Sequence, residues 1–159
     1  MRDALPLTFA PAAEADIPAL TRLMAATFAA DYRQHGGGDP RQLAPYTSDE
    51  LFHSWPFGCT DADRYKIVGA DQIVGGMVIW QFGAAEYVVG LLFVAPPHQN
   101  RGVGRRAWQF LERAYPDAPR WTVATTPWSD RNRHFYGQTC GFAPLAGAAG
   151  VEYERVRGA

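Results

Sequence analysis

The chain has 159 residues, 47% of them hydrophobic, with 15 basic and 16 acidic side chains. This length predicts one domain over residues 1–159, and an aromatic content of 13% excludes a disordered chain that cannot bury a core. A formal charge of −1 excludes a general nucleic-acid binder, because phosphate affinity needs an excess of basic side chains.

The N-terminal segment predicts a short strand over residues 7–9, followed by a helix. Asp16 is typical of an N-cap, and Pro18 is tolerated in the first turn behind it. Apolar side chains then recur at helical spacing and predict one buried face, made of Ile17, Leu20, Leu23, Met24, Thr27 and Phe28.

Residues 36–40, with the sequence Gly-Gly-Gly-Asp-Pro, are expected to end that helix. Thr47 and Glu50 have capping-box spacing, which predicts a second short helix over 48–55. Three strand patterns follow, and because their links are short they predict an antiparallel meander over residues 64–70, 73–82 and 86–94.

After Val94 the chain passes through a glycine-rich turn into a helix with Ala107, Phe110, Leu111 and Ala114 on one face. A further strand is predicted over 121–125, and Ser129 or Asp130 would cap a short helix that runs through Thr139. Two closing strands are predicted over 142–145 and 151–156. This order of a meander with crossovers indicates a mixed α/β (α+β) fold.

The turn Gln99–Arg105, between a strand and a helix, is the most informative segment. Glycines let the backbone approach a ligand, and unpaired N–H groups at a helix N-terminus favour phosphate or pyrophosphate. A loop that only turns the chain is the alternative. A Walker loop is excluded because no Lys-Ser or Lys-Thr follows the glycines, and the G-x-G-x-x-A match from Gly102 lies too far from its strand for a dinucleotide fingerprint.

Two motifs resemble those of the GNAT superfamily of N-acyltransferases. Leu92-Phe93-Val94-Ala95-Pro96 followed by Gln99-x-x-Gly102-x-Gly104 resembles its acyl-CoA-binding signature, and a second motif is found in Asn132-Arg133-His134-Phe135-Tyr136 and Cys140-Gly141-Phe142. The resemblance extends along nearly the whole chain. It implies a GNAT-like fold, a central, mostly antiparallel sheet of about seven strands, splayed between the fourth and fifth and flanked by about four helices.

The resemblance also implies acetyl-CoA as the cosubstrate. N–H groups of the turn would hold the pyrophosphate, the strand ending at Val94 would pair with pantetheine, and an N–H near Phe93 or Val94 would polarise the thioester carbonyl. Tyr136 would be the catalytic acid that protonates the departing thiolate. The implied cofactor-binding residues are Leu92, Phe93, Val94, Gln99, Asn100, Arg101, Gly102, Val103, Gly104, Arg105, Asn132 and Phe135.

The catalytic base is not fixed by the sequence. Positions at which the family often has an acid are here Gly90 and Leu91. Glu86 shares a strand face with Gly90 and Leu92, so it is a candidate base acting through a water, with a solvated strand-end carboxylate as the alternative.

Residues 31–58 correspond to the part of the family that shapes the acceptor pocket. Their aromatic character fits either a lid over the core or a pocket for an amine on an apolar body, with Asp49 and Glu50 as the nearest acids. The aromatic residues of this segment, with two more from the sheet, are Tyr32, Tyr46, Phe52, Trp55, Phe57, Trp80 and Tyr87.

Cys59 and Cys140 match no disulfide framework or zinc spacing, and the four histidines lack metal-ligand spacing, so no metal is expected. Cys140 is predicted to be a small buried hydrophobe. The N-terminus has no signal-peptide pattern and no apolar run could span a bilayer, which predicts a cytoplasmic protein without a membrane partner.

The resemblance implies an acetyl-CoA-dependent N-acetyltransferase that acts in a ternary complex on a primary amine of a small molecule or peptide. The alternative is a catalytically weak acyl-CoA-binding sensor, which the missing carboxylates before Leu92 favour. Dimerisation is common in the family, so the resemblance makes a homodimer possible.

Overall fold

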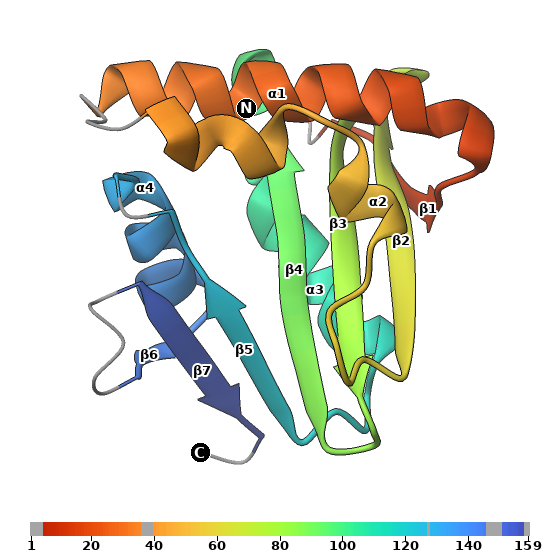
Figure 1. Ribbon diagram of the computed structural model, residues 1–159, viewed down its shortest axis with the longest axis vertical. Helices are drawn as coiled ribbons and strands as arrows, with labels where there is room; N and C mark the ends of the chain where they lie inside the picture. Colours follow the sequence, from red (N-terminus) through yellow and green to blue (C-terminus); the bar gives the residue numbers. More distant parts are fainter. Residues whose placement is uncertain (1–4, 36–39, 127, 146–150, 158–159) are drawn as a thin grey trace.

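The computed structural model describes residues 5–35, 40–126, 128–145 and 151–157. Within them, a seven-stranded sheet has the order β1-β2-β3-β4-β5-β7-β6, as Figure 1 shows. Neighbouring strands are antiparallel except β4 and β5, which are parallel. The strands are β1 (Leu7–Pro11), β2 (Asp61–Gly69), β3 (Gln72–Phe82), β4 (Glu86–Val94), β5 (Arg120–Ala124), β6 (Ala143–Pro144) and β7 (Glu152–Val156).

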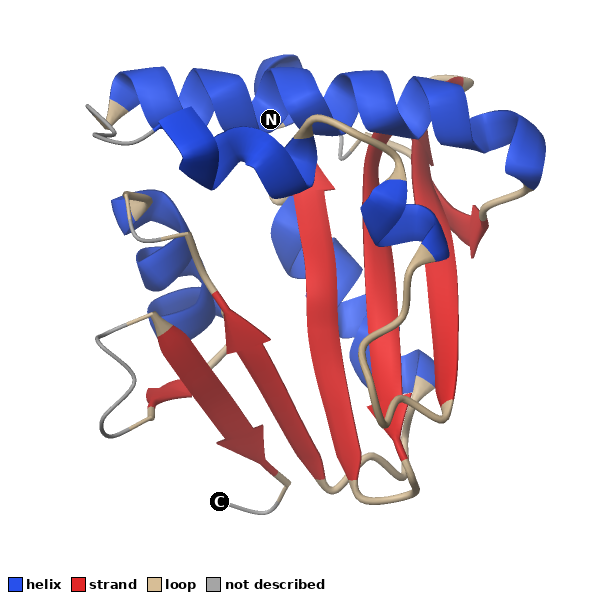
Figure 2. Cartoon of the chain, in the orientation of Figure 1, coloured by secondary structure: helices blue, strands red, loops and turns tan. Residues whose placement is uncertain are grey.

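Helices flank this sheet (Figure 2). The long helix α1 (Ile17–Gln34) crosses one end of the sheet, and α3 (Val103–Ala114) lies behind it in Figure 1. The short α2 (Glu50–His53) follows a 3-10 turn, and α4 (Asp130–His134) runs into a π-helical turn beside β5 and β7. The fold is the predicted mixed α/β class. Among the described residues, no helix has the length and hydrophobicity that a membrane span needs.

Two hydrophobic clusters hold the layers together, one on each face of the sheet. Strand alternation sends Met77 and Ile79 toward α3, whereas Val78 between them faces α1. On the α1 side, Leu20 and Met24 are fully buried, as their helical spacing predicted. On the α3 side the buried residues are Val103, Ala107, Trp108 and Leu111, and the predicted face was wrong only in including Ala114, which is exposed.

The predicted caps of the first two helices were wrong. Asp16 precedes α1, but its carboxylate accepts a hydrogen bond from the N–H of Ala13, 2.8 Å away, and pairs with Lys66 at 3.1 Å. Thr47 donates its hydroxyl to the carbonyl of Ala44, so no capping box forms and α2 is shorter than predicted. In both cases a local backbone contact outside the helix competes for the capping oxygen or hydroxyl.

An Asp16→Ala variant should be less stable than the wild-type chain at neutral pH, and this difference should shrink in acid. The Ala13 N–H and then Lys66 hold the pKa of Asp16 below its usual range. A carboxyl group whose pKa is lowered by folding stabilises the folded state at pH values above its unfolded-state pKa of about 4. This contribution is lost as the pH falls through the folded-state pKa. Urea unfolding midpoints of the variant and the wild-type chain at pH 7 and pH 3 measure this difference in stability. An equal difference at both pH values would contradict the link between the pKa of Asp16 and stability.

Several boundaries differ from those predicted. Strand β2 begins at Asp61 rather than 64, because its first residues pair with β3 as far as Gln81. The α4 helix gives way to the π-helical turn before Thr139, and the closing strands β6 and β7 are shorter than predicted. Helix α1 ends at Gln34; the predicted glycine breaker at 36–39 lies outside the described residues.

A bulge in β4 starts the separation of β4 from β5. Val78 pairs with Leu91 and Ile79 with Val89, so Gly90 is the extra residue. The parallel pairing of β4 with β5 reaches only from Tyr87 to Val89, opposite 121–123, and beyond it the two strands diverge (Figure 1). This is the splay between the fourth and fifth strands that the family resemblance implied.

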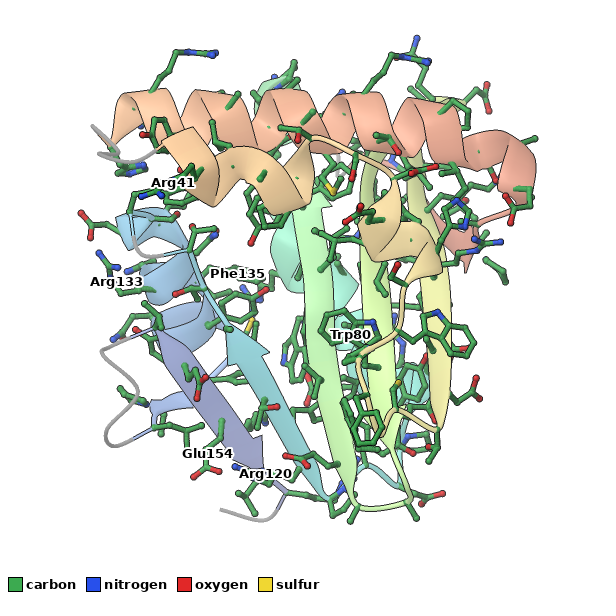
Figure 3. All side chains as sticks on the ribbon, viewed as in Figure 1. Arg41, Trp80, Arg120, Arg133, Phe135 and Glu154 are labelled. Carbon is green, nitrogen blue, oxygen red and sulfur yellow. The ribbon has the colours of Figure 1, made fainter. Side chains whose placement is uncertain are left out.

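A Gly90→Ala variant should lose about 1–3 kcal/mol of stability, the usual range for an overpacked site. An added Cβ would lie 2.7 Å from Cε2 of Trp80, whose ring covers the bulge on the face opposite α3 (Figure 3). Urea unfolding measures the loss. A Trp80→Leu change should cost less in the Gly90→Ala background than alone, and strict additivity of the two changes would contradict this contact.

Candidate active site

A cavity of about 440 Å³ lies between α1, the end of β4, the N-terminus of α3 and α4. This size is within the usual range of small-molecule sites. We call it the central cavity; its lining is Thr27, Phe28, Asp31, Leu92, Phe93, Val94, His98, Gln99, Asn100, Gly102, Val103, Gly104, Arg105, Arg131, Asn132, His134, Phe135 and Thr139.

One wall of the central cavity is the N-terminus of α3. Asn100 and Gly102 both take left-handed backbone angles, with φ of 62° and 78°, and this sharp turn lets α3 begin at Val103. The N–H of Arg106 makes the first bond back to Gly102, so the preceding N–H groups of the first turn have no partner within the helix. Together with the helix dipole they form a site suited to an anion.

The side chains in and beside the turn differ in what they contact: some line the cavity, and others bond to residues elsewhere in the chain. Arg105 lines the cavity, whereas Arg101 is exposed outside it. Arg106 donates to the carbonyl of Leu5. Gln99 donates its amide N–H to the carbonyl of Val94 at 2.8 Å and accepts from Arg131, so its side chain fixes the turn against β4 and α4.

The opposite wall is α4 with its π-helical turn, Phe135–Thr139. The hydroxyl of Ser129 caps α4 by accepting from the N–H of Asn132, which confirms the predicted cap. In the π-helical turn the N–H of Cys140 bonds to the carbonyl of Phe135, and Phe135 and Thr139 both line the cavity. Figure 3 shows Phe135 between α4 and β4, and its ring would lie 3.0 Å from a Cβ on Gly104.

Tyr136, the predicted acid, is 5% exposed and packs its ring against Phe135 and Phe142. It is not among the residues that line the cavity, but its neighbour Phe135 is. Burial, with smaller effects of Cys140 and Tyr46, raises the pKa of the Tyr136 hydroxyl far above its usual value. Tyr46 belongs to the hydrophobic cluster on the α1 face.

The structure gathers around one cavity all the cofactor-binding residues named from the sequence except Arg101. It does not bring Glu86, the candidate base, to this cavity. Glu86 pairs with Arg120 at 2.6 Å, and Arg120 also pairs with Glu154, at the end of the sheet remote from α1 (Figure 3). This ion pair is a sufficient structural reason for a carboxylate at the start of β4, and it requires no catalytic role for Glu86.

Several lining residues were missed from the sequence: Thr27, Phe28, Asp31, His98, Arg131, His134 and Thr139. One of them left a signal, because Asp31 continues the apolar stripe of α1 at helical spacing and is 3% exposed. A carboxylate on a buried face needs a partner or a ligand. His98 left no such signal in the sequence. In the structure its Nδ1 is buried and has no hydrogen-bond partner among the described residues.

The aromatic segment before β2 is only partly a wall of the cavity. Tyr46 stacks on Phe28 with ring centroids 3.8 Å apart, which supports the α1 wall from outside. Phe52 is buried, whereas Trp55 and Phe57 are exposed. Tyr87 packs against Tyr115 and Trp121 on the α3 face. Asp49 pairs with His53, and neither it nor Glu50 reaches the cavity.

Residues 22–142 match the acetyltransferase (GNAT) family. The chain belongs to the GNAT acetyltransferases. Its fold is also similar to that of the PaiA N-acetyltransferase from Thermoplasma acidophilum in complex with coenzyme A, with a TM-score of 0.76, 10% identity and coverage of 96% of this chain and 99% of the other. The ribosomal-protein-S18-alanine N-acetyltransferase of Escherichia coli gives a TM-score of 0.62 at 14% identity, covering 94% and 90%.

Among curated proteins, the chain is similar to the uncharacterized protein YrkN of Bacillus subtilis (strain 168), at 32% identity over 87 residues. The match spans 54% of this chain and 47%, about half, of that relative. In the part of the chain that the structure describes, no group of three or more His, Cys, Asp and Glu side chains is arranged to hold a metal. Cys140 is buried as predicted, and burial raises its pKa to about 12.

Proposed function

We propose that this GNAT domain is an acetyl-CoA-dependent N-acetyltransferase that transfers the acetyl group directly to a primary amine. The observation that carries the proposal is that one cavity joins the anion-binding turn at α3 to the end of β4 that has separated from β5. A ligand with a phosphate-rich head and an extended amide arm has the chemistry that suits these two features.

In this proposal acetyl-CoA supplies a thioester, whose acyl carbon the free acceptor amine attacks. The C–N bond forms, the C–S bond breaks, the nitrogen releases one proton to water, and the departing sulfur gains one proton. The N–H groups of Val103, Gly104 and Arg105 hold the pyrophosphate, and the backbone of 92–94 pairs with the amide arm. A β4 N–H near Phe93 or Val94 polarises the carbonyl as negative charge develops on its oxygen. Asn132 and Phe135 contact the arm from the α4 wall, where both line the cavity.

Tyr136 is proposed to donate its hydroxyl proton, or a hydrogen bond, to the departing sulfur. Its raised pKa keeps the hydroxyl protonated through the physiological range, as a donor requires. A further wall of the cavity is formed by Thr27, Phe28 and Asp31 of α1, so donor and acceptor can meet in one cavity. This arrangement supports direct transfer over a covalent intermediate.

A thermal-shift titration with acetyl-CoA, longer acyl-CoAs, free CoA, NAD and ATP tests the cosubstrate. A ligand at a hundred times its dissociation constant stabilises the folded state by about 2.7 kcal/mol. A shift selective for CoA compounds is expected, and thiol release with a panel of primary amines then tests transfer. A shift with NAD alone, or none with any CoA compound, would overturn the proposal.

A second candidate is an acyl-CoA-binding sensor without useful catalysis. It is favoured by the pairing of Glu86 with Arg120 and by Gly90 and Leu91 at positions where a base could stand. Tight acetyl-CoA binding with no amine-dependent thiol release would support the sensor. Amine-dependent release above the enzyme-free rate would support the transferase.

A further inference from the structure

Asp31 is a buried carboxylate in the wall of the central cavity. It is 3% exposed, and among the described residues that line this cavity it supplies the one carboxylate. Its Oδ1 accepts from Nη2 of Arg131 at 2.5 Å and lies 3.0 Å from Nδ1 of His35. An ionised carboxylate at this depth is poorly hydrated, so a cation that faces it stabilises it strongly.

Arg131, by contrast, is partly open to solvent, so its guanidinium would be hydrated if another cation took its place at Asp31. Its side chain is 31% exposed, and it reaches from α4 across the cavity to α1. The same guanidinium donates to Gln99, the first residue of the anion-binding turn. Arg131 is therefore shared between a buried carboxylate and a turn suited to phosphate, and a bound phosphate would compete with Asp31 for it.

We infer that Asp31 is the acceptor-recognition residue, and that the guanidinium of Arg131 occupies the position that the acceptor's cationic amine takes when it binds. We expect an acceptor that displaces the guanidinium to carry positive charge itself, because a neutral group would leave the buried Asp31 facing only the imidazole of His35. The predicted substrate class is thus a primary amine that arrives as an ammonium ion and loses one proton to water before its nitrogen attacks the thioester. This inference rests on the proposed transferase function.

The first test compares a cationic and an uncharged nucleophile. Thiol release from acetyl-CoA is measured with butylamine, which is protonated at neutral pH, and with hydroxylamine, which is largely uncharged there, after subtracting enzyme-free rates. In Asp31→Asn, kcat/KM for butylamine should fall at least about tenfold, whereas kcat/KM for hydroxylamine should change less than about twofold. Asp130→Asn, which removes an exposed carboxylate paired with Arg133, should match the wild-type chain.

The outcomes separate this inference from the function on which it rests. Equal losses for both nucleophiles, or no loss for either, would overturn the role of Asp31 and leave the transferase intact. No thiol release from the wild-type chain with either nucleophile would overturn the transferase and this inference with it.

The second test does not require turnover. In Arg131→Gln, Asp31 keeps its buried charge without its closest cation, so the melting temperature should fall. Butylammonium chloride should then raise the melting temperature of Arg131→Gln by about 2 °C or more beyond equimolar sodium chloride. The double variant Asp31→Asn/Arg131→Gln should lose this response. A response that is absent, or that persists in the double variant, would contradict cation binding at Asp31.

Discussion

A Gly104→Glu variant should bind acetyl-CoA at least about 100-fold more weakly than the wild-type chain. Gly104 lies in the first turn of α3, where the proposed pyrophosphate site needs free N–H groups and positive potential. A glutamate there would direct its own carboxylate to these groups, and its Cβ would press on the ring of Phe135, 3.0 Å away. Losing two charge-assisted hydrogen bonds costs about 3 kcal/mol, which corresponds to the stated factor.

Two controls separate charge from bulk and from general damage. Gly104→Ala adds the Cβ without the charge and should lose much less affinity than Gly104→Glu. Gln109→Glu adds the same charge to an exposed position of α3 away from the cavity, and should bind acetyl-CoA as the wild-type chain does. Isothermal titration measures all three. Unchanged affinity in Gly104→Glu would remove the turn from the proposed cofactor site.

The sequence predicted the elements whose signals are local. The alternation of β3 and β4, the stripe of α1 and the glycines of the turn at 99–105 each depend on neighbouring residues, and the structure has all three. Side chains that bind across the molecule were harder to predict. Asp16 lost its capping role to a backbone N–H and to Lys66, fifty residues away in the chain.

The same contrast holds within the site. The turn and the end of β4 line the cavity, as the motifs suggested, through backbone whose conformation depends on neighbouring residues. The contact between Asp31 and Arg131 joins α1 to α4 across a hundred positions of sequence, and no local pattern encodes it. The pairing of Glu86 with Arg120 likewise depends on where β5 lies, so strand period alone could not predict it.

A Tyr136→Phe variant should lower kcat about 100-fold while the affinity for acetyl-CoA stays within about twofold, since general acids contribute on the order of 10²–10⁴. Phenylalanine retains the ring contacts with Phe135 and Phe142, so the loss would report the hydroxyl. Tyr153→Phe is the matched control, because it removes a second hydroxyl from the same hydrophobic cluster without a proposed catalytic role. Its kcat should be unchanged.

The pH dependence of the wild-type chain gives this assignment an independent check. Because burial raises the pKa of Tyr136, its hydroxyl stays protonated, and kcat should show no alkaline decline from this group up to about pH 10. A decline between pH 7 and 9 that disappears in Tyr136→Phe would mean that the phenol ionises, and that it acts as a base. Unchanged kcat in Tyr136→Phe would mean that the buried ring only packs and that the departing sulfur takes its proton from elsewhere, for which His98 and His134 are the ionisable cavity residues to test next.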